Sequence, residues 1–422
     1  MPRANEIAAG GVMSRNRGHR RLLIYSHDSF GLGHLRRCRT IAHALIDHRP
    51  DLSVLILSGS PIIGSFSFRN RVDFVRIPGV IKLRHGDYTA LSLEIGIEET
   101  LALRASIIRH TADVFDPDVF LVDKEPLGLR GEVKETLTML KARGTPLVLG
   151  LRDVMDDPGQ LSKEWERKGA VPALNDLYDH IWVYGLPQIC DPLEGVPLPG
   201  AVTAKMRYTG YLRRACASAG VLPAVPSLVN GDPYLLVTTG GGGDGAALID
   251  WVLRAYEHDR DIPLPALLVL GPFMHSALQG EFMERVNRLE KVDAITFDAN
   301  VEDLMVGAAG IVAMGGYNTF CEILSFDKPG LIVPRTVPRV EQYIRASRAQ
   351  DLGLARMLAA NGEREPRQMA AALRELPYQP KPSEVRIAGL LDGLSVIAGM
   401  VDHWFSAPPA TPTRLSLVSK SS

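Results

Sequence analysis

The stretch Ala313-Met-Gly-Gly-Tyr-Asn-Thr-Phe-Cys-Glu322 decides the fold of this chain, because it joins a strand to a helix through a glycine turn. The apolar residues 310–314 predict a short buried strand, and the residues after the turn predict a helix. Gly315 and Gly316 open the turn, since glycine lets the backbone bend tightly and approach a ligand. A strand, a glycine turn and a helix in this order are typical of the ligand-binding edge of an α/β sheet.

The helix after this turn carries side chains suited to a nucleotide. Asn318 or Thr319 is expected to cap it, and its free backbone amides would attract a diphosphate. Glu322 follows on the first turn, where a carboxylate can accept two hydrogen bonds from a ribose diol. The alternative is that Glu322 is an acid favoured at this position by the helix dipole alone.

A second glycine loop precedes this one in the chain, between the expected strand 234–239 and the helix 246–256. It contains the run Gly240, Gly241, Gly242 and Gly243. Bare backbone amides in such a loop can hold a phosphate. A dinucleotide site would also need an acid at the end of the next strand, and that strand ends in Leu270-Gly-Pro272 instead. Phosphate binding is therefore favoured over binding of NAD, and a flexible turn is the alternative.

The third loop of this kind lies near the start, in Ser26-His-Asp-Ser-Phe-Gly-Leu-Gly-His34. Gly31 and Gly33 allow a tight turn, and His34 stands where the next helix begins. A neutral imidazole can act as a general base, because its ordinary pKa of about 6.5 lies near working pH. The alternative is a glycine turn with a capping or exposed histidine.

Short apolar runs alternate with helical patterns along both halves of the chain, which predicts an α/β fold with two Rossmann-like domains facing one another across a cleft. A segment rich in Ala, Ser, Gly and Pro separates the halves. The expected division is a disordered basic tail over 1–20, a first domain over 21–212, a linker over 213–229, a second domain over 230–380, a C-terminal helix packed on the body over 381–405, and a disordered tail over 406–422.

Composition excludes several function classes. The formal net charge of −1 argues against nucleic-acid binding, which usually shows a basic domain or stripe. The 4 cysteines are widely spaced, which excludes a thiolate zinc site and suits a reducing cytosol. Asp116-Pro-Asp118 precedes its strand and is interpreted as a turn, so we expect no metal site. The basic tail leaves open a peripheral contact with an anionic membrane surface.

The second half resembles the donor-nucleotide domain of GT-B glycosyltransferases, in particular the MurG-like, family-28 C-terminal type. The elements that carry the resemblance are the Gly240 loop, the Gly315 turn, Glu322, the run from Lys328-Pro-Gly330 to Pro334, and Glu341-Gln342-Tyr343. The match extends over residues 234–354, and over the first half only through Gly31-Leu-Gly-His34.

This resemblance implies a role for each matching residue. Glu322 would hold the ribose of a nucleotide-sugar donor, expected to be a UDP-sugar, and Gln342 would hold the hydroxyls of the donor sugar. Glu341 stands where MurG-like proteins often have a second glutamine. His34 would lie at the reaction centre, oriented by Asp123, with no cofactor and no metal. The acceptor would be a glycan, a lipid or a small molecule.

Other functions remain open at this point. The Gly-Leu-Gly-His-Leu-Arg-Arg-Cys loop also resembles that of the nucleotide-sugar hydrolase of pseudaminic-acid synthesis, in which water would be the nucleophile. A catalytically silent nucleotide-sugar-binding protein is a second alternative, and an NAD oxidoreductase is a distant one. Arg36, Arg37 and Arg39 are interpreted as a solvated helix face, with contact to an anionic acceptor or a membrane as the alternative. Arg152 and Asp153 are interpreted as polar residues after a strand, with contact to the acceptor or a phosphate as the alternative.

Overall fold

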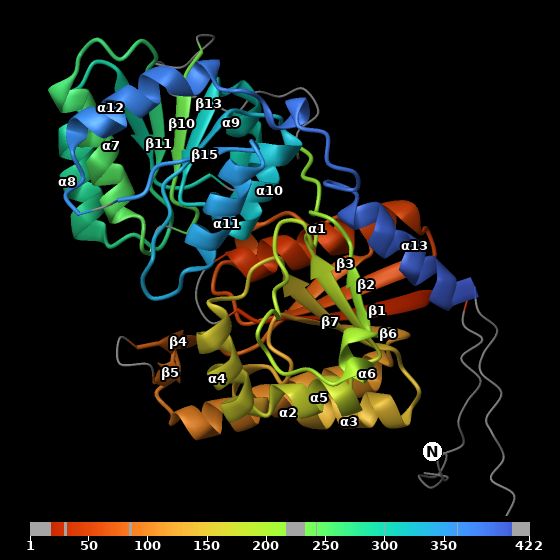
Figure 1. Cartoon of the computed structure of the whole chain (residues 1–422). Helices are drawn as coiled ribbons and strands as arrows, with labels where there is room; N and C mark the ends of the chain where they lie inside the picture. Colours follow the sequence, from red (N-terminus) through yellow and green to blue (C-terminus); the bar gives the residue numbers. More distant parts are fainter. Residues whose placement is uncertain are drawn as a thin grey trace, which may run out of the picture.

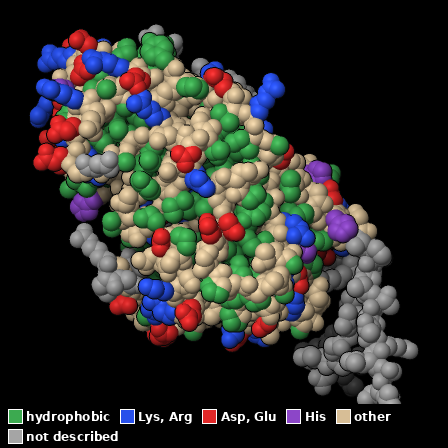
Figure 2. All heavy atoms as spheres, in the orientation of Figure 1, with side chains coloured by type: hydrophobic (Ala, Val, Ile, Leu, Met, Phe, Trp, Pro, Cys, Tyr) green, Lys and Arg blue, Asp and Glu red, His purple; other side chains and the backbone are tan. Residues whose placement is uncertain are grey.

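The computed structural model describes residues 18–28, 32–83, 87–216, 233–241, 243–298, 300–360 and 362–406. They form two α/β domains, each built on a parallel sheet, which lie one above the other in Figure 1. Most of the expected tails and linker (residues 1–17, 217–232 and 407–422), as well as Gly31 and Gly242, lie outside the described residues. On the face drawn in Figure 2, acidic and basic side chains are interspersed, in keeping with the small net charge.

The first domain is built on a seven-stranded sheet of order β3-β2-β1-β6-β7-β8-β9. Its central strands are mostly apolar and buried apart from arginines at the start of β1 and the end of β7, as expected for a sheet covered by helices on both faces. The strands are β1 (Arg20–Ser26), β2 (Leu52–Ser58), β3 (Val72–Arg76), β6 (Val119–Asp123), β7 (Leu147–Arg152), β8 (His180–Tyr184) and β9 (Met206–Tyr208). The other elements are the hairpin β4 (Val80–Lys82) and β5 (Tyr88–Ala90), and the helices α1 (Gly33–His48), α2 (Ile97–Phe115), α3 (Lys134–Ala142), α4 (Pro158–Lys168), α5 (Ala170–Asp176) and α6 (Gly200–Thr203).

The second domain is built on a six-stranded sheet of order β12-β11-β10-β13-β14-β15. The strands are β10 (Leu235–Thr238), β11 (Ala266–Val269), β12 (Val292–Ile295), β13 (Gly310–Ala313), β14 (Gly330–Ile332) and β15 (Arg356–Met357). The helices are α7 (Ala246–His258), α8 (Ser276–Val286), α9 (Val301–Gly307), α10 (Tyr317–Ser325), α11 (Glu341–Asp351) and α12 (Pro366–Glu375).

The C-terminal segment differs from the expected helix over 381–405. Helix α13 spans Gly393–Ser406 and packs beside α1 on the first domain, after a 3-10 turn at Pro382–Glu384. Between the 3-10 turn and α13 the backbone turns at Gly389, whose φ is 75°. It passes so close to Gly210 that a Cβ on Gly210 would lie 2.2 Å from the Gly389 carbonyl oxygen. The Tyr211 amide also donates to the Leu390 carbonyl over 2.8 Å. The apolar residues have helical spacing, but the prediction was wrong before Gly393. There the backbone approaches Gly210 and Tyr211 of the first domain, and the Leu390 carbonyl accepts from Tyr211.

The two sheets place their ligand-binding edges opposite one another. In the first sheet the strand order reverses between β1 and β6, and in the second between β10 and β13. Open α/β sheets bind ligands in the crevice at such a reversal. Every loop singled out from the sequence follows one of these strands. The apolar core is continuous between the domains, because Tyr211 stacks on Tyr317 and meets Phe320 edge-on.

Candidate functional site

His34 and Asp123 meet at the reversal point of the first sheet. His34 lies on the first turn of α1, and Asp123 ends the neighbouring strand β6, so a hydrogen bond joins His34 Nδ1 to Asp123 Oδ2. Arg37, one turn further along α1, donates to both carboxylate oxygens of Asp123, over 2.8 and 2.6 Å. The Asp123 and Arg37 side chains are buried, whereas His34 keeps 18% of its side chain exposed. This cluster is a fixed acid–base unit with one accessible ring.

The charges of this cluster prepare His34 to accept a proton. Burial alone would raise the pKa of Asp123, but the positive charge of Arg37 and the hydrogen bonds from His34 and Arg37 hold it well below its usual range. An ionised carboxylate only accepts hydrogen bonds, so the proton of a neutral His34 lies on Nδ1 and Nε2 keeps its lone pair. Burial, aided by Arg37, lowers the pKa of His34 against the pull of Asp123. The ring is therefore neutral at pH 7 and can act as a base at Nε2.

The glycine turns of the second domain have the conformations that only glycine adopts easily. Gly240 has a φ of 68° and Gly315 a φ of 79°. A Cβ on Gly315 would lie 2.6 Å from the Ile332 side chain, so this position also has no room for a side chain. Gly316 precedes α10, and its carbonyl accepts from the Phe320 amide as the first bond of that helix. The amides before Phe320 at this helix start are thus donors for an anion.

The expected capping of α10 by Asn318 or Thr319 is wrong: no side chain caps this helix. Asn318 instead connects the domains, because its Nδ2 donates to the Gly33 carbonyl over 2.9 Å and its Oδ1 accepts from Arg214 over 2.6 Å. Thr319 is buried beside it. The start of α10 therefore lies against the start of α1, within one turn of His34.

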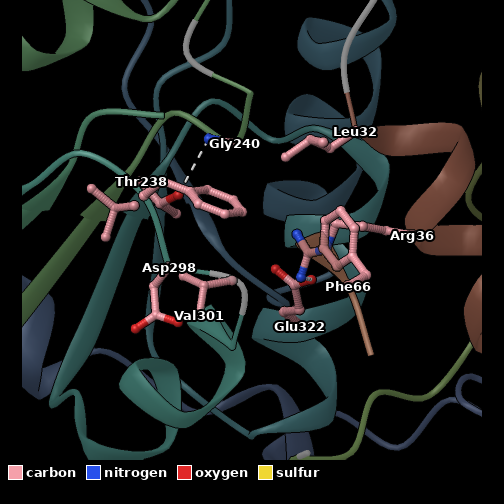
Figure 3. Close-up of a pocket in the computed structure, with 10 residues that line it drawn as sticks. Leu32, Arg36, Phe66, Thr238, Gly240, Asp298, Val301 and Glu322 are labelled. Carbon is pink, nitrogen blue, oxygen red and sulfur yellow. Dashed lines mark hydrogen bonds and ion pairs between the residues drawn. The ribbon is translucent and has the colours of Figure 1, made fainter. Parts of the chain in front are cut away.

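Glu322 is fully buried and held by a residue of the other domain. Arg36 on α1 lies against Glu322 (Figure 3) and donates through Nη2 to Glu322 Oε1 over 2.6 Å. The same Nη2 donates to Glu302 Oε1 over 2.7 Å. The second oxygen, Glu322 Oε2, is buried and has no hydrogen-bond partner in the described part of the chain. Burial raises the pKa of Glu322 to about 7, with Arg36 opposing the rise and Glu302 adding to it. An unsatisfied buried acceptor is the feature a ribose diol would complete.

The space beside Glu322 is nearly closed. It measures about 20 Å³, enough for a water molecule but not for a nucleotide. Figure 3 shows Leu32 and Phe66 of the first domain pointing into it, opposite Thr238 and Gly240 of the second. Apolar contact and the Arg36–Glu322 bond keep this side of the cleft narrow.

Glu341 and Gln342 begin helix α11 on the other side of the glycine turns. Gln342 Oε1 accepts from the Arg335 amide over 3.2 Å, and Glu341 Oε1 accepts from Arg335 Nη2 over 2.9 Å. Arg335 also pairs with Asp244 in the loop after Gly240. Arg335 thus ties the predicted sugar-binding residues to the predicted phosphate loop. The carboxylate oxygen Glu341 Oε2 is buried without a partner among the described residues.

Sequence reasoning missed the arginines that organise the site. The interpretation of the α1 arginines as a solvated face is wrong for Arg36 and Arg37, which bind Glu322 and Asp123. The spacing i, i+3 from His34 places Arg37 on the same helix face and is a signal that could have found it. Asp153, interpreted as a polar residue after a strand, forms a buried ion pair with Arg345 of the second domain over 2.6 Å.

The residues 18–28, 32–83, 87–216, 233–241, 243–298, 300–360 and 362–406 contain no group of three or more His, Cys, Asp or Glu side chains able to hold a metal ion. Metal-independent chemistry stays a prediction. No helix in the same part of the chain is long and apolar enough to cross a bilayer.

Comparison with known proteins finds a family model that matches the second domain. Residues 235–386 match the model of the glycosyltransferase family 28 C-terminal domain, which confirms the resemblance found in the sequence. A curated relative from Pseudothermotoga lettingae is 28% identical over 105 residues, and is named UDP-N-acetylglucosamine–N-acetylmuramyl-(pentapeptide) pyrophosphoryl-undecaprenol N-acetylglucosamine transferase. That match covers 25% of this chain and spans 28% of the relative's length.

Solved structures extend the likeness to the whole fold. A glycotransferase of kitacinnamycin superposes with a TM-score of 0.59 at 16% identity, over 92% of this chain and 99% of its own. Phytolacca americana UGT2, complexed with UDP-2fluoro-glucose and pterostilbene, superposes with a TM-score of 0.60 at 15% identity, over 92% of this chain and 100% of its own. Acinetobacter baumannii MurG superposes with a TM-score of 0.53 at 12% identity, over 91% of this chain and 99% of its own. The predicted two-domain GT-B architecture is therefore confirmed.

Proposed function

We propose that this chain, whose residues 235–386 form a glycosyltransferase family 28 C-terminal domain within a GT-B fold, transfers a sugar from a nucleoside-diphosphate donor to an acceptor hydroxyl with inversion. The donor is expected to be a UDP-sugar, since the Phytolacca americana relative was solved with UDP-2fluoro-glucose. The observation that carries the proposal is the Asn318–Gly33 hydrogen bond, which sets the base-bearing end of α1 against the glycine-turn end of α10.

The first domain supplies the base in this proposal. His34 Nε2 takes the proton of the acceptor hydroxyl as its oxygen attacks the anomeric carbon of the donor. The bond from that carbon to the diphosphate oxygen breaks, and the nucleoside diphosphate leaves with the electron pair. Asp123 holds the ring by Nδ1 and stabilises the imidazolium, and Arg37 keeps Asp123 ionised. Attack opposite the leaving group inverts the anomeric centre.

The second domain holds the donor. Glu322 receives the ribose hydroxyls once Arg36 has released it, and Gln342 and Glu341 receive the sugar. The backbone amides at the start of α10 and in the loop after Gly240 stabilise the charge that develops on the diphosphate. Such preorganised donors contribute most where water is excluded, as in a cleft that closes on its ligand.

A two-step assay tests this function against its rivals. A thermal-shift screen against UDP-, dTDP- and GDP-sugars should raise the melting temperature with at least one of them, because a ligand of the native state stabilises it. Incubation with that donor alone should release little free sugar. Free-sugar release at a rate equal to any transfer would favour the hydrolase, and tight binding without turnover would favour a silent binding protein.

The proposed location is the cytoplasm. The described cysteines Cys38, Cys190, Cys216 and Cys321 are all free, in keeping with a reducing compartment. Contact of the basic residues 1–20 with an anionic membrane surface remains part of the proposal, and most of those residues lie outside the described ones.

A further inference from the structure

A cavity of about 730 Å³ opens beside His34, apart from the small space at Glu322. His27 and His34 line it together with Tyr88, the loop after β6, the 3-10 turn Leu129–Gly131 and helix α4, and Arg339 of the second domain completes the lining. Its volume lies in the range of small-molecule sites, about 300–1,000 Å³. Because the base lines this cavity, the cavity is positioned to hold the acceptor.

The lining of this cavity carries a surplus of positive charge. Its cations are Lys124, Arg130, Arg167, Lys168 and Arg339. Its carboxylates are Glu125 and Glu164. A cavity lined mostly by one sign of charge attracts ligands of the opposite sign.

Both carboxylates of the lining already pair with cations of the lining. Lys168 Nζ lies 2.8 Å from Glu125 Oε2 and 2.6 Å from Glu164 Oε1. Arg339 donates to Glu164 as well, over 3.0 Å. Within the described part of the chain, Arg167 has no carboxylate within ion-pair distance. Arg130 pairs with Glu98, outside the lining, over 2.9 Å, and Arg339 also pairs with Asp156 over 3.3 Å. The lining itself still holds more cations than carboxylates, and Arg167 is the one left without a carboxylate among the described residues.

Two of the cations are held in an unusual backbone conformation. Lys124 has a φ of 69° and Arg130 a φ of 48°, in the left-handed region that side chains other than glycine rarely adopt. Lys124 directly follows Asp123, and its side chain is only 13% exposed. Strained conformations of this kind gather at ligand sites, where the surrounding fold enforces them. Both residues line the cavity.

The pKa of Lys124 is consistent with a site that binds an anion. Burial lowers the pKa of Lys124 to about 8, Glu125 opposes this, and the positive charges of Arg152, Arg339 and Lys168 add to the lowering. A bound anion would reverse the effect of these neighbouring cations.

We propose that this cavity binds an acceptor bearing a carboxylate or phosphate group, with that group at Lys124, Arg130 and Arg167 and the reacting hydroxyl at His34. This assignment rests on the proposed function and names the acceptor class for the same reaction. During transfer the anionic group is unchanged. It anchors the acceptor while the hydroxyl oxygen bonds to the anomeric carbon and its proton passes to His34 Nε2.

Calorimetric titration of the full chain with glucose, glucose 6-phosphate and glucuronate tests this site. At least one charged sugar should bind about tenfold or more tightly than glucose, and the one that does identifies phosphate or carboxylate as the anchor. Lys124→Met and Arg167→Gln should each weaken that binding at least fivefold, since charge-assisted hydrogen bonds are lost. Arg109→Gln, an exposed arginine on α2 outside the cavity, should change it less than twofold.

The same titrations separate this inference from the proposed function. Glu322→Ala should keep the affinity for the charged sugar, and Lys124→Met should keep the affinity for UDP. If UDP binds but neither charged sugar outbinds glucose, or if both cavity variants bind like the wild type, the anionic acceptor is ruled out and the donor site stands. If the charged sugar binds in the cavity but neither UDP nor any nucleotide sugar binds, the proposed transfer fails and the anion site stands.

Discussion

Arg36 is predicted to compete with the donor, so removing it should tighten nucleotide binding. In the structure its Nη2 holds Glu322 over 2.6 Å and Glu302 over 2.7 Å, and 12% of the Arg36 side chain is exposed. A ribose diol can reach Glu322 only when the first of these bonds breaks. A hydrogen bond to a charged group contributes about 1.5–3 kcal/mol. Arg36→Met should therefore tighten UDP binding about 10- to 150-fold.

The gain should depend on pH with a defined sign. Arg36 lowers the pKa of Glu322, which stands at about 7 in its presence, so the variant raises it further. Glu322 is then ionised only at alkaline pH, and the gain should be larger at pH 9 than at pH 6. Titration calorimetry with UDP at both values measures this difference.

The matched control for this experiment is Arg39→Met. Arg39 lies one turn along the same helix and donates to the Ser67 carbonyl over 2.9 Å, within the first domain. Its removal should leave UDP affinity within about twofold, since no bond to Glu322 is lost. If Arg36→Met instead weakened UDP binding while Arg39→Met did not, Arg36 would be a nucleotide ligand and the competition would be refuted.

Three further results are expected. His34→Ala should keep UDP affinity within about threefold but reduce the rate of transfer about 10²–10⁴-fold in steady-state assays. Transfer at the wild-type rate would show that His34 is not the base. Transfer should persist in excess EDTA, because the amides of α10 rather than a cation are assigned to the diphosphate, and complete loss restored by Mn²⁺ would reveal a metal site. Arg345→Met should lower the free energy of unfolding by about 3–5 kcal/mol, because it leaves the buried Asp153 carboxylate without a cation, held only by the Tyr211 hydroxyl and the Val154 amide. A urea-denaturation midpoint equal to the wild type would contradict that account.

Local patterns were enough to predict the fold. Strand runs such as 310–314 and the turns at Gly240 and Gly315 depend on residues adjacent in the chain, and periodicity and glycine chemistry report on these directly. The order of β1 and β6 in the sheet then follows from the α/β topology, which brings the loops of His34 and Asp123 to one edge.

Contacts between the domains could not be predicted in this way. Arg36 bonds to Glu322 across 286 positions of the chain, and Asp153 to Arg345 across 192. Nothing in the residues around Arg36 indicates such a partner, because an arginine run on a helix has the same pattern whether solvent or a second domain faces it. The segment around Gly389 was misread for the same reason, since its turn serves a close crossing with Gly210.

Binding of UDP to the wild type, to Glu322→Ala and to Glu302→Ala tests the central claim most directly. Both carboxylates bind Arg36, but only Glu322 has a buried oxygen left without a partner among the described residues. Glu322→Ala should weaken UDP binding at least about tenfold in calorimetry, and Glu302→Ala should stay within about threefold of the wild type. Equal affinity of a folded Glu322→Ala protein and the wild type would contradict the assignment of this cleft as a nucleotide-sugar site.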